Sequence, residues 1–136
     1  MENRKHKIKD VSLDPTYWSK DIDFIITSSI SGEVKSFEVK WDYRINGTQN
    51  LYLELTNRNS KQWNGEGWWK HCEADYLAYG DAKANKFYVF DMAALRERVE
   101  GLPRNVKNCG YDSTGLIVSL NKLADLYIEM PVAFAY

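Results

Sequence analysis

The sequence predicts a mixed α/β protein of the α+β type, built on a central mixed sheet that contains an antiparallel meander and is flanked by helices. Two observations indicate this class. Residues 23–28, 35–41 and 51–56 are runs rich in β-branched, aromatic and other apolar residues, which is typical of strands. Met92, Leu95 and Val99 recur at helical spacing behind Asp91, a good helix N-cap. The length of 136 residues predicts one domain over residues 1–136.

The first half of the chain supplies the predicted meander. A short helix or arm is expected at 16–20, and strands at 23–28 and 35–41 are joined by a turn into a hairpin. Asn46-Gly47 is a turn signal that precedes a third strand at 51–56. Leu51, Leu53 and Leu55 fall on one face of that strand, and Glu54 falls on the other. The three strands together predict a sheet with one polar edge.

The second half alternates strands and helices. A polar loop is expected at 57–67, a short helix at 68–73, and strands at 76–79 and 86–90. The helix that Asp91 opens should end before Gly101 and Pro103. A strand at 116–120, a short helix at 121–126 and an apolar packing segment at 130–136 complete the expected order.

Composition excludes several classes of protein. No apolar run approaches the length of a membrane span, and the N-terminus lacks the apolar stretch of a signal peptide. These observations predict a cytoplasmic protein without a membrane partner. Cys72 and Cys109 are not in a Cys-x-x-Cys motif, so two reduced thiols are expected rather than a zinc ribbon or a disulfide framework.

The strand at 35–41 places charges on an otherwise apolar element. Extended backbone turns Phe37, Val39 and Trp41 one way, and the opposite face carries charged side chains. Those charged residues are Glu38, Lys40 and Asp42. Charges of this kind are costly to bury unless they are paired or hold a metal. The other interpretation is a solvent-exposed ladder on an antiparallel sheet, and the pattern alone leaves both open.

Asp23, Glu38 and Lys40 resemble the signature of the PD-(D/E)xK nuclease superfamily, which includes restriction endonucleases and Holliday junction resolvases. No Pro precedes Asp23, but that Pro is often missing in the superfamily. The resemblance covers roughly residues 21–98 and is strongest to a small, mostly phage-encoded branch. The segments that carry it beyond the triplet are 37–42, Gln49-Asn50-Leu51-Tyr52-Leu53-Glu54, Gly67-Trp68-Trp69 and Glu73-Ala74-Asp75-Tyr76.

The resemblance implies a restriction endonuclease-like fold and a site that uses Mg²⁺, or Mn²⁺, to hydrolyse DNA. Asp23 and Glu38 would bind the metal through oxygen, and Lys40 would sit beside the attacking water. Asp42, on the same face, and Glu54, on the neighbouring strand of the expected meander, are candidates for further metal ligands. A second assignment, with Asp42 as first acid and Glu54-x-Thr56 as the later pair, lacks its Lys.

Several basic residues are candidates for contact with substrate phosphates, although the net charge of −1 says little about where binding occurs. Solvated surface charge is the alternative interpretation for each of them. Trp63, Trp68 and Trp69 either stack on bases or pack a loop against the core. The candidate substrate-binding residues are Lys70, His71, Arg58 and Lys61.

The sequence therefore predicts a metal-dependent nuclease acting on DNA in phage replication or recombination, located in the host cytoplasm if the protein is phage-encoded. The alternative is a catalytically weak nucleic-acid-binding or accessory protein that keeps the nuclease fold. A third hypothesis is an acidic face that binds a basic partner. Because 136 residues leave little room for a separate recognition domain, a homodimer is one expected way of completing a DNA cleft.

Overall fold

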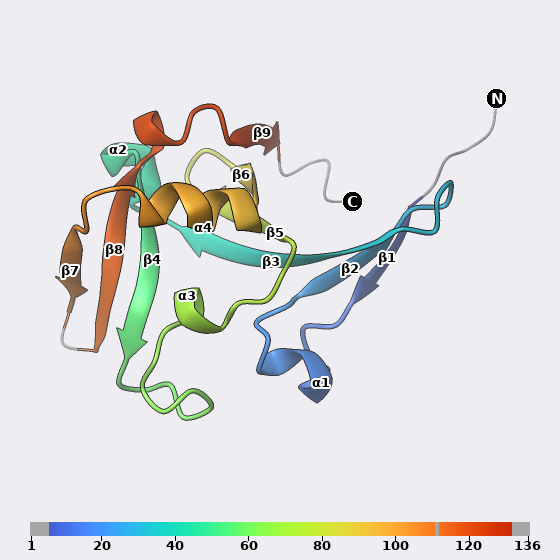
Figure 1. Ribbon diagram of the computed structural model, residues 1–136, viewed down its shortest axis with the longest axis horizontal. Coiled ribbons are helices and arrows are strands. Elements are labelled where there is room, and N and C mark those ends of the chain that lie inside the picture. The colour runs from blue at the N-terminus through green and yellow to red at the C-terminus, as the bar shows by residue number, and fades with distance from the viewer. Residues whose placement is uncertain (1–5, 111, 132–136) are drawn as a thin grey trace.

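The computed structural model describes residues 6–110 and 112–131, and they form an α+β fold with a six-stranded mixed sheet and a three-stranded antiparallel sheet (Figure 1). The strands are β1 (Lys7–Asp10), β2 (Phe24–Thr27), β3 (Val34–Asp42), β4 (Asn50–Asn57), β5 (Tyr76–Asp81), β6 (Lys86–Asp91), β7 (Val106–Cys109), β8 (Ser113–Ser119) and β9 (Tyr127–Pro131). The helices are α1 (Pro15–Trp18), α2 (Ile45–Thr48), α3 (Trp68–His71) and α4 (Met92–Glu100), with a 3₁₀ turn, η1 (Leu120–Lys122).

The larger sheet has the strand order β1-β2-β3-β5-β6-β9. Its pairs are antiparallel except for β3 and β5, which run parallel, with Glu38 opposite Leu77 and Asp42 opposite Asp81. The chain leaves the sheet after β3, builds β4 and α3, and returns as β5. This excursion is long enough for the crossover that a parallel pair requires.

The predicted hairpin of β2 and β3 is confirmed, with Phe24 opposite Phe37. The meander predicted to continue into the third strand is wrong, because β4 pairs with β8 in the other sheet. Asn46-Gly47 lies within α2 rather than in a hairpin turn, and Gln49 follows it with a left-handed φ of 57°. This turn sends β4 away from β3.

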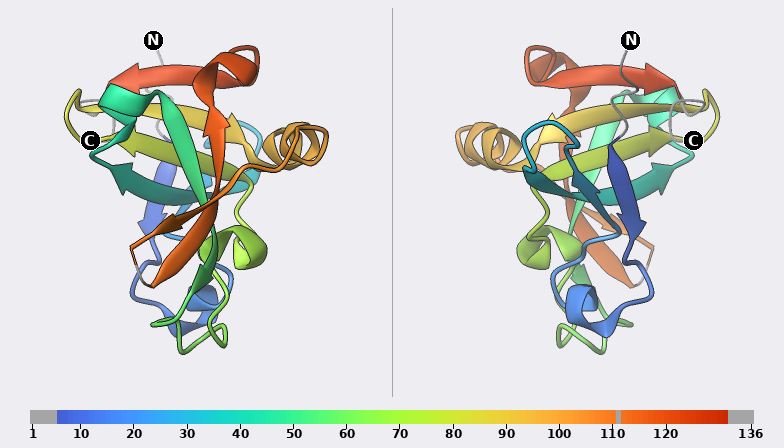
Figure 2. Two further views of the ribbon diagram at one scale, coloured as in Figure 1. Left: turned by 90° about the vertical axis from the view of Figure 1, so that its left-hand side faces the viewer. Right: turned by 90° about the vertical axis from the view of Figure 1, so that its right-hand side faces the viewer.

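The core cluster contains residues of both sheets, whose arrangement Figure 2 shows from two sides. The predicted alternation of β4 is confirmed, because Leu51, Leu53 and Leu55 are buried. They belong to the same apolar cluster as Leu77 of β5 and Phe90 of β6. Each such side chain contributes about 1.5–3 kcal/mol when it is fully buried, so this cluster fixes the smaller sheet against the larger one.

Helix α4 follows its predicted pattern. Asp91 accepts a hydrogen bond from the Ala94 N–H at 3.0 Å, and Leu95 and Val99 are buried. The short helix expected at 121–126 is only the turn η1, and the apolar end of the chain contains β9, which pairs with β6. Residues 132–136 of the predicted packing segment lie outside the described residues.

Besides β9, two strands were not expected from the sequence. β1 forms one edge of the larger sheet and is exposed at all four residues, while β7 forms an edge of the smaller sheet and is mostly exposed. Their polar residues bury no apolar face, so they lack the alternation by which a strand is recognised. Among the described residues, no helix is both long enough and apolar enough to cross a membrane.

Candidate functional site

The polar face of β3 points into the protein. Glu38 is 2% exposed, whereas Trp41 on the opposite face is 50% exposed and packs against Phe87 with ring centroids 4.7 Å apart. The interpretation of these charges as a solvent-exposed ladder is therefore wrong for Glu38. A buried carboxylate requires partners, because its transfer from water is costly unless it is paired.

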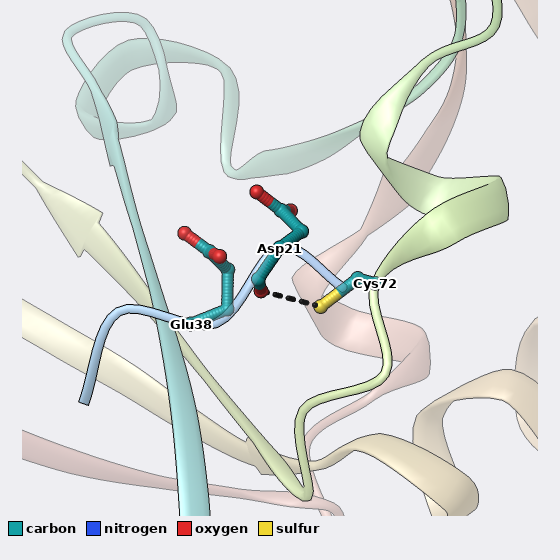
Figure 3. Close-up of side chains that lie close together, drawn as sticks. All are labelled: Asp21, Glu38 and Cys72. Carbon is teal, nitrogen blue, oxygen red and sulfur yellow. Dashed lines mark hydrogen bonds between the residues drawn. The ribbon is translucent and has the colours of Figure 1, made fainter. Parts of the chain in front are cut away.

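The partners of Glu38 form a compact cluster under α3. The potential ligand atoms of Asp21, Glu38 and Cys72 all lie within 4.8 Å of one another. Figure 3 shows these three side chains close together. The Lys40 Nζ is 3.1 Å from Asp21 Oδ2 and 3.6 Å from Glu38 Oε1. We call Asp21, Asp23, Glu38, Lys40 and Cys72 the buried cluster.

Asp23 joins this cluster through the backbone of β3. The Val39 N–H donates to Asp23 Oδ2 at 2.9 Å and also lies 3.1 Å from Glu38 Oε1. Two carboxylates thus share one donor. The structure brings together Asp23, Glu38 and Lys40, the three residues of the sequence signature.

The charges of the cluster are only partly compensated. Glu38 Oε2 is buried and has no hydrogen-bond partner among the described residues. Asp21 Oδ2 is also buried without a hydrogen bond, and its 3.1 Å contact with Lys40 is an ion pair that lacks hydrogen-bond geometry; the Lys40 Nζ donates instead to Asp21 Oδ1 at 3.3 Å. Three carboxyl groups therefore face a single ammonium.

Burial shifts the pKa values of Glu38 and Lys40 in opposite directions. Burial and the neighbouring Asp23 carboxyl raise the pKa of Glu38 well above its usual value, although Lys40 acts in the other direction. Burial also lowers the pKa of Lys40, but the carboxylates of Asp21 and Glu38 outweigh it, so the net shift of that pKa is upward. Lys40 is therefore an ammonium at neutral pH.

Helix α3 covers the cluster. The Lys40 Nζ lies 4.9 Å from the centroid of the Trp68 ring, a cation–π distance. The approach of α3 to β4 depends on Gly67, where an added Cβ would lie 2.4 Å from the Glu54 carbonyl oxygen. Trp68 is thus a packing residue that also shields Lys40. Of the two roles left open by the sequence, stacking on bases or packing against the core, Trp68 has the second.

Asp21 and Cys72 belong to the cluster but were not predicted from the sequence as site residues. Asp21 lies in the loop between α1 and β2 and has a left-handed φ of 54°, which is uncommon for a residue other than Gly. Its signal in the sequence is that it is a second acid two residues before Asp23. Strand alternation does not place it, because its backbone is left-handed. Cys72 follows α3 directly, and no sequence motif marks it.

Asp42 lies apart from the cluster. It is four residues beyond Glu38, which corresponds to about 13 Å along a strand. Its Oδ1 accepts the backbone N–H groups of Arg44 at 2.6 Å and Ile45 at 3.2 Å, and its Oδ2 accepts the Tyr79 hydroxyl at 2.5 Å. These bonds give Asp42 a structural role at the entry to α2.

Glu54 is also separated from the cluster, because its strand belongs to the other sheet. Its Oε2 accepts hydrogen bonds from Asn57 Nδ2 and Ser113 Oγ, each at 3.3 Å. The expectation that Glu54 lies on a strand next to β3 is wrong, because β4 pairs with β8 and not with β3.

The four candidate substrate-binding residues lie on or near the loop at 57–67. Lys70 Nζ is 3.1 Å from Glu66 Oε2, and His71 Nε2 is 3.2 Å from Glu66 Oε1. His71 also stacks on Trp63, with ring centroids 5.0 Å apart. Arg58 and Lys61 are exposed. The structure thus places Lys70 and His71 beside an acid, with Lys70 exposed at the surface.

The donor atoms of the cluster fit a small hard cation better than a soft one. Carboxylate oxygens suit Mg²⁺ and Mn²⁺, and Asp21 and Glu38 each supply one oxygen that accepts no hydrogen bond. Cys72 does not fit, since burial raises the pKa of its thiol to about 12 and Sγ donates to the Asp21 carbonyl at 3.4 Å. Metal binding by sulfur requires the thiolate.

Comparisons of this chain with protein-family models, with curated proteins and with solved structures give no match.

Proposed function

We propose that this protein is a divalent-metal-dependent nuclease that hydrolyses phosphodiester bonds in DNA, in phage replication or recombination, at the buried cluster. The observation that carries the proposal is the Glu38 carboxyl group, which is 2% exposed and has an oxygen without a hydrogen-bond partner. It lies beside Asp21, whose Oδ2 contacts Lys40 but accepts no hydrogen bond. A cation between these oxygens would take the place of the proton that burial favours on Glu38 in the metal-free protein. The resemblance of Asp23, Glu38 and Lys40 to the nuclease signature supports the same chemistry.

Four residues of the cluster have roles in this proposal, and Cys72 has none. Asp21 and Glu38 hold Mg²⁺ or Mn²⁺, with Asp23 fixing Glu38 through the shared Val39 N–H. A bound ion of this kind lowers the pKa of a water molecule and neutralises charge on the phosphate. Lys40, held as an ammonium by Asp21, orients the attacking water and faces the developing negative charge.

Cleavage of labelled DNA tests the proposal. Single-stranded, duplex and branched substrates are incubated with the protein in Mn²⁺, in Mg²⁺ and in EDTA. The wild type should cleave only with metal, and Glu38→Gln should be inactive although folded. Glu54→Gln is the matched control, because it makes the same substitution on the other sheet. Full activity of Glu38→Gln would refute the proposed site.

A second candidate function is a nucleic-acid-binding or accessory protein without turnover. It is favoured by the limited access to the cluster, since the Asp21 side chain is 14% exposed and the Glu38 side chain 3%. In that case Lys40 and its carboxylates are a buried structural network. DNA binding in EDTA without cleavage in either metal would select this candidate.

A further inference from the structure

A groove borders α3 at Trp69 and Lys70, whereas Trp68 of the same helix contacts Lys40 of the buried cluster. The groove has a volume of about 760 Å³ and is bounded by α4, by the loop that follows it, and by β4, β7 and β8. Figure 2 shows α4 standing to one side of the three-stranded sheet. Its apolar lining includes Leu55, Val99, Leu116 and Val118.

Positive charge dominates this groove although the chain as a whole has a net charge of −1. Its lining includes one acid, Glu100, among the described residues. The cations that line it are Lys70, Arg96, Arg104, Lys107 and Lys122. They come from α3, α4, the loop after α4, β7 and η1, so they are distributed around the groove and do not converge on one point.

Three of these cations are available to a ligand. Within residues 6–110 and 112–131, no ion pair joins Arg104, Lys107 or Lys122 to a carboxylate. Arg96 has a different role, because it donates to the carbonyls of Trp69 at 2.7 Å and Cys72 at 2.8 Å. Arg96 therefore ties the groove wall to the segment that carries the cluster's thiol.

We propose that this groove binds a few nucleotides of a single nucleic-acid strand, with phosphates at Arg104, Lys107 and Lys122 and sugar or base surface on the apolar floor. The volume of about 760 Å³ lies within the range of small-ligand sites, so we assign the groove a short stretch of one strand rather than a duplex. Spread cations match the repeating charge of a backbone. The choice of nucleic acid among polyanions rests on the proposed function.

Fluorescence anisotropy with labelled dodecamers of deoxythymidine and of uridine tests the groove in EDTA, where cleavage plays no part. The wild type should bind, and its log affinity should fall with log salt. The triple variant Arg104→Gln, Lys107→Gln, Lys122→Gln should bind more weakly, with a salt slope smaller by about 2, since each single-strand phosphate contact contributes about 0.7. The two dodecamers separate a DNA strand from an RNA strand.

The matched control is the triple variant Lys7→Gln, Lys9→Gln, Lys83→Gln, which makes the same change in net charge at exposed positions outside the groove. It should keep the wild-type slope. Any of three results would contradict the groove proposal. They are an equal loss of affinity in both triple variants, absence of binding at low salt, and tighter binding of heparin than of either dodecamer. Binding in EDTA with no cleavage in Mn²⁺ would contradict the nuclease proposal and leave the groove proposal standing. Metal-dependent cleavage that the groove variant does not affect would contradict the groove proposal and leave the nuclease proposal standing.

Discussion

Asp21 and Lys40 are 19 residues apart in the sequence and form the tightest ion pair of the buried cluster, with Nζ 3.1 Å from Oδ2. The backbone of Asp21, in the loop between α1 and β2, is left-handed. Strained conformations of this kind persist where the surrounding structure holds them, often at functional sites. The pair fixes Lys40 beside Glu38 and leaves one oxygen of each acid without a hydrogen bond.

The stability of the metal-free protein should fall as pH rises above about 4.5, the ordinary pKa of Glu. Burial raises the pKa of Glu38, so the folded state holds this proton more tightly than the unfolded state. The free energy of unfolding then decreases with pH by at most about 1.4 kcal/mol per unit from this group. Urea denaturation in EDTA from pH 5 to 9 measures the slope, and Glu38→Gln should flatten it. An identical slope in the variant would contradict this assignment.

Divalent metal should stabilise the wild type and not Asp21→Asn. A ligand at one hundred times its dissociation constant adds about 2.7 kcal/mol to the free energy of unfolding, and thermal melts with and without Mn²⁺ detect such a change. Glu54→Gln should respond like the wild type, because Glu54 lies on the smaller sheet. Equal metal-induced shifts in wild type and Asp21→Asn would remove Asp21 from the site.

Lys40→Ala should reduce turnover much more than metal affinity. Lys40 carries a positive charge and is not a ligand for a cation, so its loss leaves the carboxylate oxygens in place. Calorimetric titration with Mn²⁺ gives the affinity, and cleavage at saturating metal gives the rate. A variant that cleaves at the wild-type rate would exclude Lys40 from the reaction.

Asp42→Ala should destabilise the fold without affecting the metal response. The substitution leaves the Tyr79 hydroxyl, on a side chain that is 3% exposed, without its acceptor. An unsatisfied buried polar group costs about 1–3 kcal/mol. Urea denaturation measures the loss, and a metal-induced shift of wild-type size should remain. Disappearance of that shift would return Asp42 to the metal site.

Gly67→Ala should destabilise the protein by about 1–3 kcal/mol, the usual cost of overpacking. The new Cβ would meet the backbone of Glu54, which cannot rotate away, so α3 and Trp68 must move. Gly47→Ala is the control, because an added Cβ there meets nothing within 4 Å. Equal stability of the two variants would show that α3 yields without cost.

The sequence predicted the elements that have strong local signals. The hairpin of β2 and β3 and the helix opened by Asp91 were predicted because alternation and capping are properties of neighbouring residues. The strand that pairs with β4 was not predicted. The alternating leucines of β4 determine which of its faces is buried, but not which sheet it joins.

The candidate site was predictable to a similar extent. The resemblance identified Asp23, Glu38 and Lys40, which the structure brings together. Asp21 and Cys72 reach the cluster through a loop with positive φ and through the end of α3. Such placement depends on tertiary packing, which has no periodic signal in the sequence.

The edges of the larger sheet restrict how copies of this chain associate. Strand β1 carries Lys7 and Lys9 at one edge, and β9 ends in Pro131 at the other. Charge on an edge strand repels a second copy, and Pro lacks the N–H that an added strand would need. Growth into fibrils by edge-to-edge pairing is therefore opposed at both ends of this sheet. A second copy that completes a DNA cleft would therefore have to associate elsewhere than at these two edges.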